Sequence, residues 1–532
     1  MSGGPSAWTS QNTPTAMGTP RRAAGKAVRR GGRSPVRPPS GDHGISVVRS
    51  VLRSGSRAGV RFRWRPSPAG RRLRVRSSGS FWSCSWRASF FLLGFLESHR
   101  GMRRWNHRIQ GKRCRSGSID SSIGCRHNRY DPQRWNRFRD PRQVAAGESH
   151  RYRAGMASNT TATRSPLHDF HLQHGAKMVD YAGWELPLHY GSIGDEHVWT
   201  RTSGGLFDVS HMGRLRITGR HARRFLDRVC TRLVRGMAGG QCRYGLICNE
   251  TGGCLDDVLV YCFADDDYMV VCNGANRVKI VAHFERVKAE EDHRFKMVDQ
   301  TESTCMCAIQ GPKVMELLGA VSTEVPTLKR YRFTVKNVLV MKIIVSRTGY
   351  TGEDGVEVIL GAKFAKQALG MLLKDVGADD AAVRPVGLGA RDSLRMEAGM
   401  PLYGHEIDEA TDPLSAGLGF AVKLDKGESD AQEGRFIGQD ALRKIAGTGS
   451  TRKLVGLALE GRRSPRQGMA VLDGDRPVGT VTSGCPSPTL GHPIAMAYVP
   501  AEMAKAGETV RIDLGGGTDA KIVDLPFYKR PS

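Results

Sequence analysis

The stretch GGCLDDVLVY, residues 252–261, constrains the fold of this chain most strongly. Paired glycines permit backbone angles with φ above zero, so the stretch predicts a tight turn that leads into a β-strand beginning near Val258. Asp256 and Asp257 would then lie at the start of that strand. Because successive strand residues point to opposite faces, only one of these carboxylates can face a pocket unless the turn twists them. From these ten residues alone, the simpler interpretation is that both are solvated turn carboxylates.

The net charge of +28 at pH 7 comes almost entirely from the first part of the chain. Residues 1–155 contain 33 Lys and Arg, 31 of them Arg, against 6 Asp and Glu, whereas residues 156–532 contain 47 basic and 46 acidic residues. A basic nucleic-acid module would therefore depend wholly on residues 1–155. The apolar run 88–96 is too short to span a bilayer. We predict neither a nucleic-acid nor a membrane partner.

Residues 1–155 show neither a helical nor a strand period, and we expect a non-globular, Arg-rich extension there. Our preferred interpretation is an over-extended reading of the gene, with translation starting at Met156. The alternatives are a disordered arm that binds phosphates, and a transit peptide, which is also rich in Arg and poor in acidic residues.

The twelve cysteines do not follow a recognisable pairing pattern. Nine of them fall after Met156, an odd number, and reduced, mostly buried thiols are expected. Cys305 and Cys307 form C-x-C, not the C-x-x-C of a zinc site, and no matching histidine pair follows. We assign no metal.

Short helical and strand patterns alternate after Met156. A hairpin of residues 258–263 with 268–272, an amphipathic helix over 276–290 and a helix opened by Pro312 predict α+β domains with largely antiparallel sheets. No G-x-G-x-x-G follows a strand, so a Rossmann site is not supported. From Lys453 onward, alternating strands indicate a small barrel or sandwich, after a boundary in 425–451 that is rich in Gly, Ser and charge.

A second informative stretch is RTGYTGEDGVEV, residues 347–358. Its three glycines predict sharp turns, and in the strand that follows, Glu357 points away from the face shared by Val356 and Val358. Such a carboxylate is either exposed to solvent or directed into a cleft. His211 could be a general base, although a lone histidine is more often a hydrogen-bonded structural residue.

Several long motifs follow one another in the order of a known family: AKMVDYAGWELPLHY, GLFDVSHMG, NETGGCLDDVLVY, IQGP, SRTGYTGEDGVEV, GLGARDSLRMEAGMPLYG, FIGQDAL and GTVTSGCPSPTLG. Together they resemble the aminomethyltransferase family, the T-proteins of the glycine cleavage system, over residues 165–527. The resemblance implies an α+β multidomain cloverleaf. Its folate-binding region, two interleaved α+β domains with antiparallel sheets, would occupy 156–440, and a small C-terminal β-barrel would occupy 450–532.

The family takes the aminomethyl group from the lipoyl arm of a partner, the H-protein, releases ammonia and passes the one-carbon unit to tetrahydrofolate as the methylene form. The resemblance therefore implies tetrahydrofolate as co-substrate, no metal, lipoylated H-protein as partner, and functional association with the other glycine cleavage proteins. The compartment would be the cytoplasm in a bacterium or the mitochondrial matrix in a eukaryote.

The resemblance also implies roles for individual residues. Asp257 would contact the folate ring nitrogens and assist attack on the aminomethyl carbon, with Asp256 as a structural cap. Glu357 and Tyr350 would hold the pterin, whose N–H donors suit a carboxylate. Arg391 would meet the glutamyl carboxylate or anchor the carboxylate network. Four residues would line the ring slot: Met212, Tyr244, Leu259 and Tyr261. Tyr528 would close it, and Arg466 would lie near the cleft.

Two rivals share this fold. The folate domain of sarcosine or dimethylglycine dehydrogenases follows an FAD domain, and residues 1–155 contain no glycine fingerprint for one. A non-catalytic folate-binding branch that supports iron–sulfur proteins is marked by K-G-C-[FY]-x-G-Q. Here residues 435–442 read RFIGQDAL, and Asp257 is kept.

Overall fold

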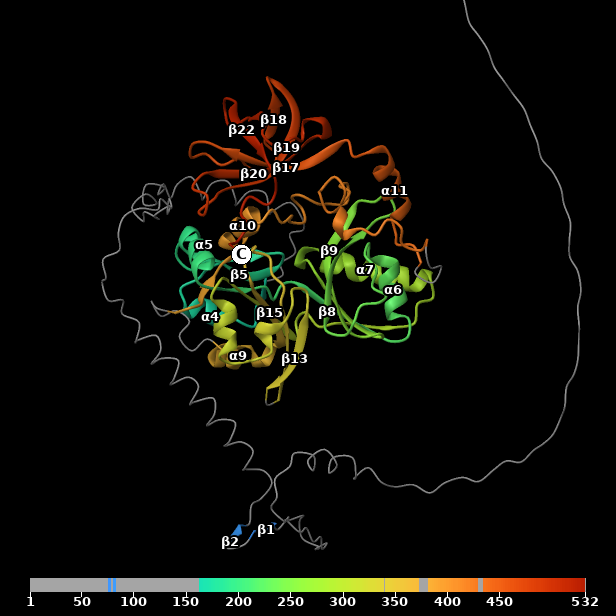
Figure 1. Ribbon diagram of the computed structural model, residues 1–532, viewed down its shortest axis with the longest axis vertical. Coiled ribbons are helices and arrows are strands. Elements are labelled where there is room, and N and C mark those ends of the chain that lie inside the picture. Colours follow the sequence, from blue (N-terminus) through green and yellow to red (C-terminus); the bar gives the residue numbers. More distant parts are fainter. Residues whose placement is uncertain are drawn as a thin grey trace, which may run out of the picture. The chain divides into compact units, whose positions relative to one another are not determined.

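The computed structural model describes residues 162–338, 340–372, 381–428 and 434–531, together with two short paired strands, β1 (Val75–Ser77) and β2 (Ser80–Trp82) (Figure 1). The chain divides into two units, residues 1–95 and 96–532, and the features below all belong to the second. Apart from β1 and β2, the extension predicted over 1–155 lies outside the described residues.

A five-stranded antiparallel sheet carries the GGCLDDVLVY stretch. Its strands, in hydrogen-bonded order, are β11 (Lys296–Asp299), β7 (Gly213–Thr218), β10 (Asp267–Cys272), β9 (Cys254–Ala264) and β8 (Gln241–Cys248). Helices α6 (Ala222–Val229) and α7 (Arg277–Glu290) pack on one face, where the rings of Phe225 and Phe284 meet edge to face at 5.1 Å. The predicted hairpin of β9 and β10 is confirmed.

A six-stranded sheet faces the first across a shared apolar layer. Its order is β13 (Phe333–Val338), β14 (Met341–Ser346), β15 (Gly355–Gly361), β12 (Thr304–Gln310), β6 (Gly205–Asp208) and β16 (Arg384–Val386). Only β16 and β6 pair in parallel. Packed against its other face are α4 (His168–Gln173), α8 (Val314–Gly319) and α9 (Ala365–Leu372). In the chain, β7 to β11 come between β6 and β12, so one sheet is inserted into the sequence of the other.

The C-terminal strands close into a barrel, as predicted. In order around the barrel they are β17 (Arg452–Leu459), β20 (Pro493–Pro500), β19 (Arg476–Pro486), β18 (Ala470–Asp473), β21 (Thr509–Ile512) and β22 (Thr518–Val523). Buried apolar side chains from all six strands fill its interior. Helix α10 (Leu388–Glu397) packs against α5 (Ile193–Thr202) and against β19 and β20 of the barrel.

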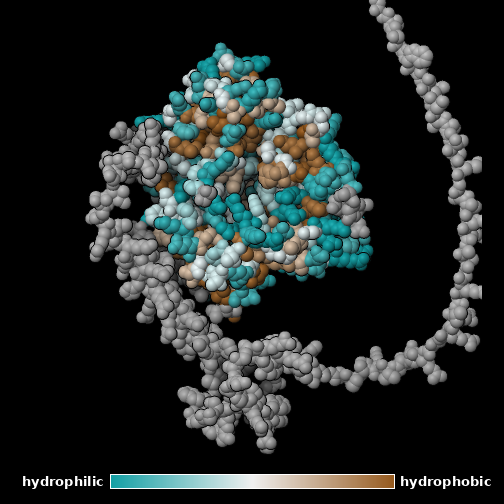
Figure 2. All heavy atoms as spheres, in the orientation of Figure 1, coloured by the Kyte–Doolittle hydropathy of each residue, from teal (hydrophilic) through white to brown (hydrophobic). Residues whose placement is uncertain are grey.

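The remaining described elements are β3 (Thr163–Arg164), β4 (Lys177–Tyr181), β5 (Trp184–His189), α11 (Gln439–Thr448), and the 3₁₀ turns η3 (Gly274–Asn276), η4 (Val325–Thr327), η5 (Ala362–Phe364), η6 (Gly419–Ala421) and η7 (Ala501–Met503). Trp184 is buried. No helix of the described residues is long and apolar enough to cross a membrane. Hydrophilic residues cover much of the face seen in Figure 2, with hydrophobic patches between them.

Two sequence-based expectations about where elements begin are wrong, and a third region contains a helix that was not predicted. Strand β9 begins at Cys254, not near Val258, because Cys254 already pairs with Cys248 of β8. Helix α8 begins at Val314, so Pro312 precedes the helix and does not open it. The region 425–451 contains helix α11, whose Leu442 is buried against β8 and β9 residues. The glycines and charged residues of this region made the short apolar face of α11 hard to recognise in the sequence.

Candidate active site

Strand β9 directs alternate side chains into two different layers. Val258 and Val260 belong to the core shared with α6 and α7, whereas Leu259 and Tyr261 belong to the layer between the two sheets. Because Asp257 has the parity of Leu259 and Tyr261, it is directed toward the layer between the sheets, and Asp256 toward α7. The predicted division of the two aspartates is therefore observed.

Asp257 is half-buried and held by two side-chain hydrogen bonds. The hydroxyl of Tyr244, on β8, donates to Oδ2 at 3.2 Å, and Nδ2 of Asn273, directly after β10, donates to Oδ1 at 2.7 Å. Burial raises the pKa of Asp257, while the bonds from Asn273 and Tyr244 act in the opposite direction. A carboxylate whose pKa is raised toward neutrality is suited to exchange protons.

Asp256 is fully buried on the opposite face. It accepts hydrogen bonds from the backbone N–H of Asn273 at 3.0 Å, from Nδ2 of Asn273 at 2.8 Å and from Nδ2 of Asn276 at 2.7 Å. Burial raises its pKa, and the charge of Asp257 adds to the increase. These bonds hold the segment that enters α7 against β9, which is the structural role predicted for Asp256.

Glu357 on β15 is buried and points away from the face shared by Val356 and Val358, toward the layer between the sheets. Thr348 Oγ1 donates to its Oε2, and Thr348 Oγ1 in turn lies 2.7 Å from Ser346 Oγ. Burial raises the pKa of Glu357, while the Thr348 bond and the charge of Arg391 lower it. Of the two roles left open for this carboxylate, exposure to solvent is excluded.

Arg391 of α10 brings a cation to the same region. Its guanidinium carbon lies 4.7 Å from the ring centroid of Tyr350, whose hydroxyl donates to the carbonyl of Pro401. The Nη1 of Arg391 is buried and has no hydrogen-bond partner among the described residues. Buried donors are almost always paired, so a ligand or water is the expected partner of this atom.

His211 supplies a second buried atom of this kind, since its Nδ1 also has no partner among the described residues. Burial and then the charge of Arg391 lower the pKa of His211 to about 3, so the imidazole is neutral at pH 7. At that pH the neutral ring can donate or accept a hydrogen bond, but it is not an imidazolium that could act as a general acid.

The structure gathers most of the predicted site residues. Tyr261 is buried with its hydroxyl 3.0 Å from Ser346 Oγ, Met212 and Leu259 flank the layer between the sheets, and Asp257 acts electrostatically on Tyr244 and Tyr350. In chain order the gathered residues are Met212, Tyr244, Asp257, Leu259, Tyr261, Tyr350, Glu357 and Arg391.

Tyr528 and Arg466 make their contacts elsewhere. The ring of Tyr528 lies 4.0 Å from the guanidinium carbon of Arg201, and its backbone N–H donates to the carbonyl of Glu397. Arg466 is exposed, and its backbone N–H donates to the sulfur of Met469. Folate contacts stay predictions for these two residues and for the gathered ones alike.

Sequence reasoning missed Asn273. The only available signal was a polar amide directly after a buried strand, next to Gly274. Its importance depends on the register of β10 with β9, which places that position beside both aspartates.

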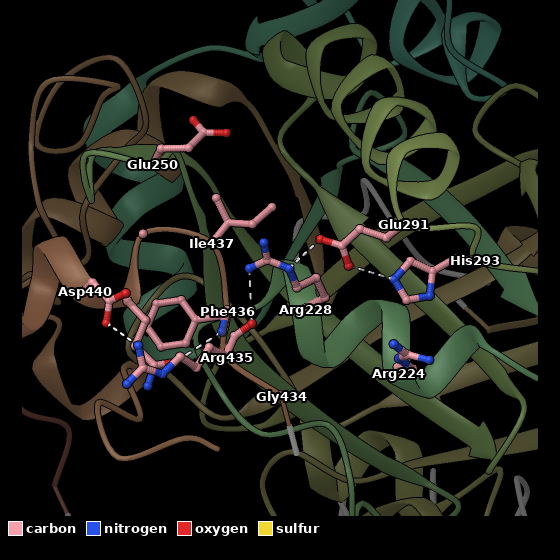
Figure 3. Close-up of a pocket in the computed structure, with 12 residues that line it drawn as sticks. Arg224, Arg228, Glu250, Glu291, His293, Gly434, Arg435, Phe436, Ile437 and Asp440 are labelled. Carbon is pink, nitrogen blue, oxygen red and sulfur yellow. Dashed lines mark hydrogen bonds and ion pairs between the residues drawn. The ribbon is translucent and has the colours of Figure 1, made fainter. Parts of the chain in front are cut away.

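A separate open cavity of about 820 Å³ lies between α6, the end of α7 and residues 434–440 (Figure 3). Some of its charged groups form ion pairs with one another, among them Arg228 with Glu291 at 2.6 Å and Arg435 with Asp440 at 2.7 Å. It contains none of the predicted site residues and adjoins 429–433, which lie outside the described residues. We therefore place the candidate site at Asp257. No group of three or more possible metal ligands occurs among the described residues.

Comparisons with known proteins match most of the described chain. Residues 167–426 match the family model described as the GCVT N-terminal domain, and residues 452–529 match the glycine cleavage T-protein C-terminal barrel domain. The aminomethyltransferase of Saccharopolyspora erythraea is 42% identical over 372 residues, 69% of this chain and 98% of that one. That of Rubrobacter xylanophilus is 45% identical over 371 residues, 70% and 95% of the two chains.

This chain belongs to the aminomethyltransferase family of the glycine cleavage system. The crystal structure of glycine cleavage system aminomethyltransferase T from Bartonella henselae matches it with a TM-score of 0.63 and 32% identity, over 69% of this chain and 98% of that one. The predicted family and the α+β cloverleaf with its C-terminal barrel are thereby confirmed for this aminomethyltransferase. The non-catalytic alternative is not favoured.

Proposed function

We propose that this aminomethyltransferase moves the one-carbon unit of an aminomethyl group, carried on the lipoyl arm of an H-protein, to tetrahydrofolate. The products are 5,10-methylenetetrahydrofolate, ammonia and dihydrolipoyl H-protein. In this reaction the methylene carbon loses its bonds to nitrogen and sulfur and gains two bonds to folate nitrogens. The two N–H protons displaced from the folate end on ammonia and on the thiol. The observation that carries the proposal is that Asp257 and Glu357, from different sheets, are directed into one layer that Arg391 also reaches.

The residues present fit a folate. Its flat ring presents amino and ring N–H donors, which suit the buried carboxylate of Glu357, held in place by Thr348. The unpaired Nη1 of Arg391 and Nδ1 of His211 can each take a polar atom of the ligand. Tetrahydrofolate supplies the two amine nitrogens that receive the carbon.

Asp257 is the proton-handling group in this proposal. Asn273 and Tyr244 orient its carboxylate, and burial raises its proton affinity, so it can accept a proton from the attacking nitrogen and return it to the departing group. Orientation of two bound substrates contributes more of the rate than this single proton transfer.

The choice of lipoyl H-protein as donor rests on membership of the glycine cleavage T-protein family. We further propose that the chain after residue 156 is organised as two interleaved domains over 156–440 and a barrel over 450–532, which the inserted sheet and the closed barrel support. The compartment stays a prediction.

Glu357→Gln is expected to weaken folate binding by about 10–100-fold, because a hydrogen bond to a charged group contributes about 1.5–3 kcal/mol. Isothermal titration with 5-formyltetrahydrofolate, a stable folate, measures the change in Kd. Glu302→Gln is the matched control, since that side chain is 66% exposed and pairs with Arg277 at the surface. Absence of folate binding by the unmodified protein would refute the proposed co-substrate.

A further inference from the structure

Asn273 connects the two neighbouring carboxylates of β9 through a single amide group. Its Nδ2 lies 2.8 Å from Oδ1 of Asp256 and 2.7 Å from Oδ1 of Asp257. A carboxamide nitrogen carries two hydrogens, so it can donate one to each carboxylate. Strand alternation directs the two side chains to opposite faces of the sheet. The amide of Asn273, the residue directly after β10, bonds to both of them.

No cation from the described residues bonds to either carboxylate. The side chains that donate to them are Asn273, Asn276 and Tyr244. Lys279 of α7 is engaged elsewhere, since its Nζ donates to Tyr403 at 2.6 Å and to Glu409 at 2.8 Å.

The titratable groups that face the pair are neutral or acidic. The charge of Asp256 raises the pKa of Cys272 on β10 and of Tyr403, in the segment after α10. The charge of Asp257 raises the pKa of Tyr244 on β8, of Cys254 on β9 and of Tyr350. Two full negative charges in such surroundings repel each other with little compensation, so loss of a proton by one carboxylate opposes loss by the other.

We propose that Asp256 is a positioning residue for the transfer reaction, which acts on Asp257 through Asn273 so that the two carboxylates exchange protons as one pair. This inference rests on the proposed function, in which Asp257 handles the proton. A charge on Asp256 makes Asp257 hold its proton more strongly. The shared amide of Asn273 holds Oδ1 of Asp256 and Oδ1 of Asp257 in fixed positions. The proton that Asp257 accepts from the attacking nitrogen is returned to the departing group, so the pair is unchanged after each turnover.

A residue that only capped α7 would need acceptor oxygens and no charge. The two roles differ in the effect of Asp256→Asn, which keeps an acceptor for Asn276 but removes the charge. Removal of a neighbouring negative charge favours the ionised form of Asp257, so the pKa of Asp257 must fall. Under a purely structural role, stability would change and the titration of Asp257 would not.

The test follows the carboxyl carbon of Asp257 by NMR in the full chain labelled with [4-¹³C]aspartate, the signal being assigned by its loss in Asp257→Asn. We expect the pKa of Asp257 in Asp256→Asn to fall by at least one unit, and the acidic limb of the pH–rate profile to move with it. Asp412→Asn is the matched control, because this carboxylate also caps a turn, at Leu414 and Ser415, without contacting Asn273. It should leave both readouts unchanged.

Asn273→Ala provides a second variant with the opposite sign. It leaves both charges and removes the shared donor, so the pKa of Asp257 should rise. An unchanged titration of Asp257 in both variants would overturn the inference and leave Asp256 as a cap. If Asp256→Asn does not fold, the direction of the shift in Asn273→Ala decides the matter, with no rise overturning it. The NMR titration needs no turnover, so failure of the proposed function, seen as no folate-dependent transfer by the unmodified protein, is distinguishable from failure of this inference.

Discussion

Asp257→Asn is expected to slow methylene transfer to tetrahydrofolate by about 10²–10⁴-fold, the usual contribution of a positioned acid–base group. An amide at this position keeps the size of the side chain but cannot take up the proton. The amide keeps one oxygen, which can accept from Nδ2 of Asn273, and its NH₂ group can donate to the hydroxyl of Tyr244, so the fold should persist. Single-turnover transfer from aminomethyl-loaded H-protein, followed as methylenetetrahydrofolate, measures the effect.

The control for this variant is Asp265→Asn, at the turn that follows β9. Its side chain is 76% exposed and pairs with Arg223 at 3.0 Å, so its loss should change the transfer rate less than twofold. A transfer rate in Asp257→Asn within a factor of three of the unmodified protein would remove Asp257 from the chemistry, wherever the folate binds.

Glu397→Ala is expected to cost about 3–5 kcal/mol of unfolding free energy, because it leaves buried donors and a buried cation without their partner. Glu397, at the end of α10, is fully buried. It accepts from Nε2 of His197 at 3.0 Å and from Nε and Nη2 of Arg201 at 3.1 and 3.0 Å. The hydroxyl of Ser487 and the backbone N–H of Thr489, between β19 and β20, donate to its other oxygen. The carboxylate thus joins α5 and α10 to the barrel.

Urea unfolding measures this loss, and Glu397→Gln is the matched variant, which keeps an acceptor and should cost less. The pH dependence gives a second readout. The hydrogen bond from His197 and the charges of His197 and Arg201 lower the pKa of Glu397 to about 2. Its contribution is therefore complete above the ordinary glutamate pKa and is lost as the pH falls from about 4.5 toward 2. Equal acid sensitivity in Glu397→Gln and the unmodified protein would contradict this assignment.

Strand alternation predicted correctly the part of the site that depends on single strands. Alternation showed that only one of Asp256 and Asp257 could face a pocket, and that Glu357 points away from Val356 and Val358. The family resemblance then selected Asp257. The structure places Asp257 and Glu357 toward the layer between the sheets. The β9–β10 hairpin and the C-terminal barrel could be predicted for the same reason, because short alternating strands separated by turns are a local sequence signal.

Contacts between elements could not be predicted in this way. Asn273 meets both aspartates only through the register of β10 with β9, and Arg391 reaches Tyr350 only through the position of α10. Helix α11 was hidden because glycine and charge dominate its surroundings, while its stability comes from Leu442 packing on a distant sheet. The start of β9 was placed four residues late because pairing with Cys248, and not β propensity, sets it.

The most direct test of the proposed function is a single turnover of the purified protein with H-protein that carries a ¹³C-labelled aminomethyl group, in the presence and absence of tetrahydrofolate. We expect the label to appear as 5,10-methylenetetrahydrofolate, with one ammonia released for each carbon transferred, only when tetrahydrofolate is present. Release of ammonia at the same rate without tetrahydrofolate, or no labelled methylenetetrahydrofolate when it is present, would contradict folate-dependent transfer at the site of Asp257 and Glu357.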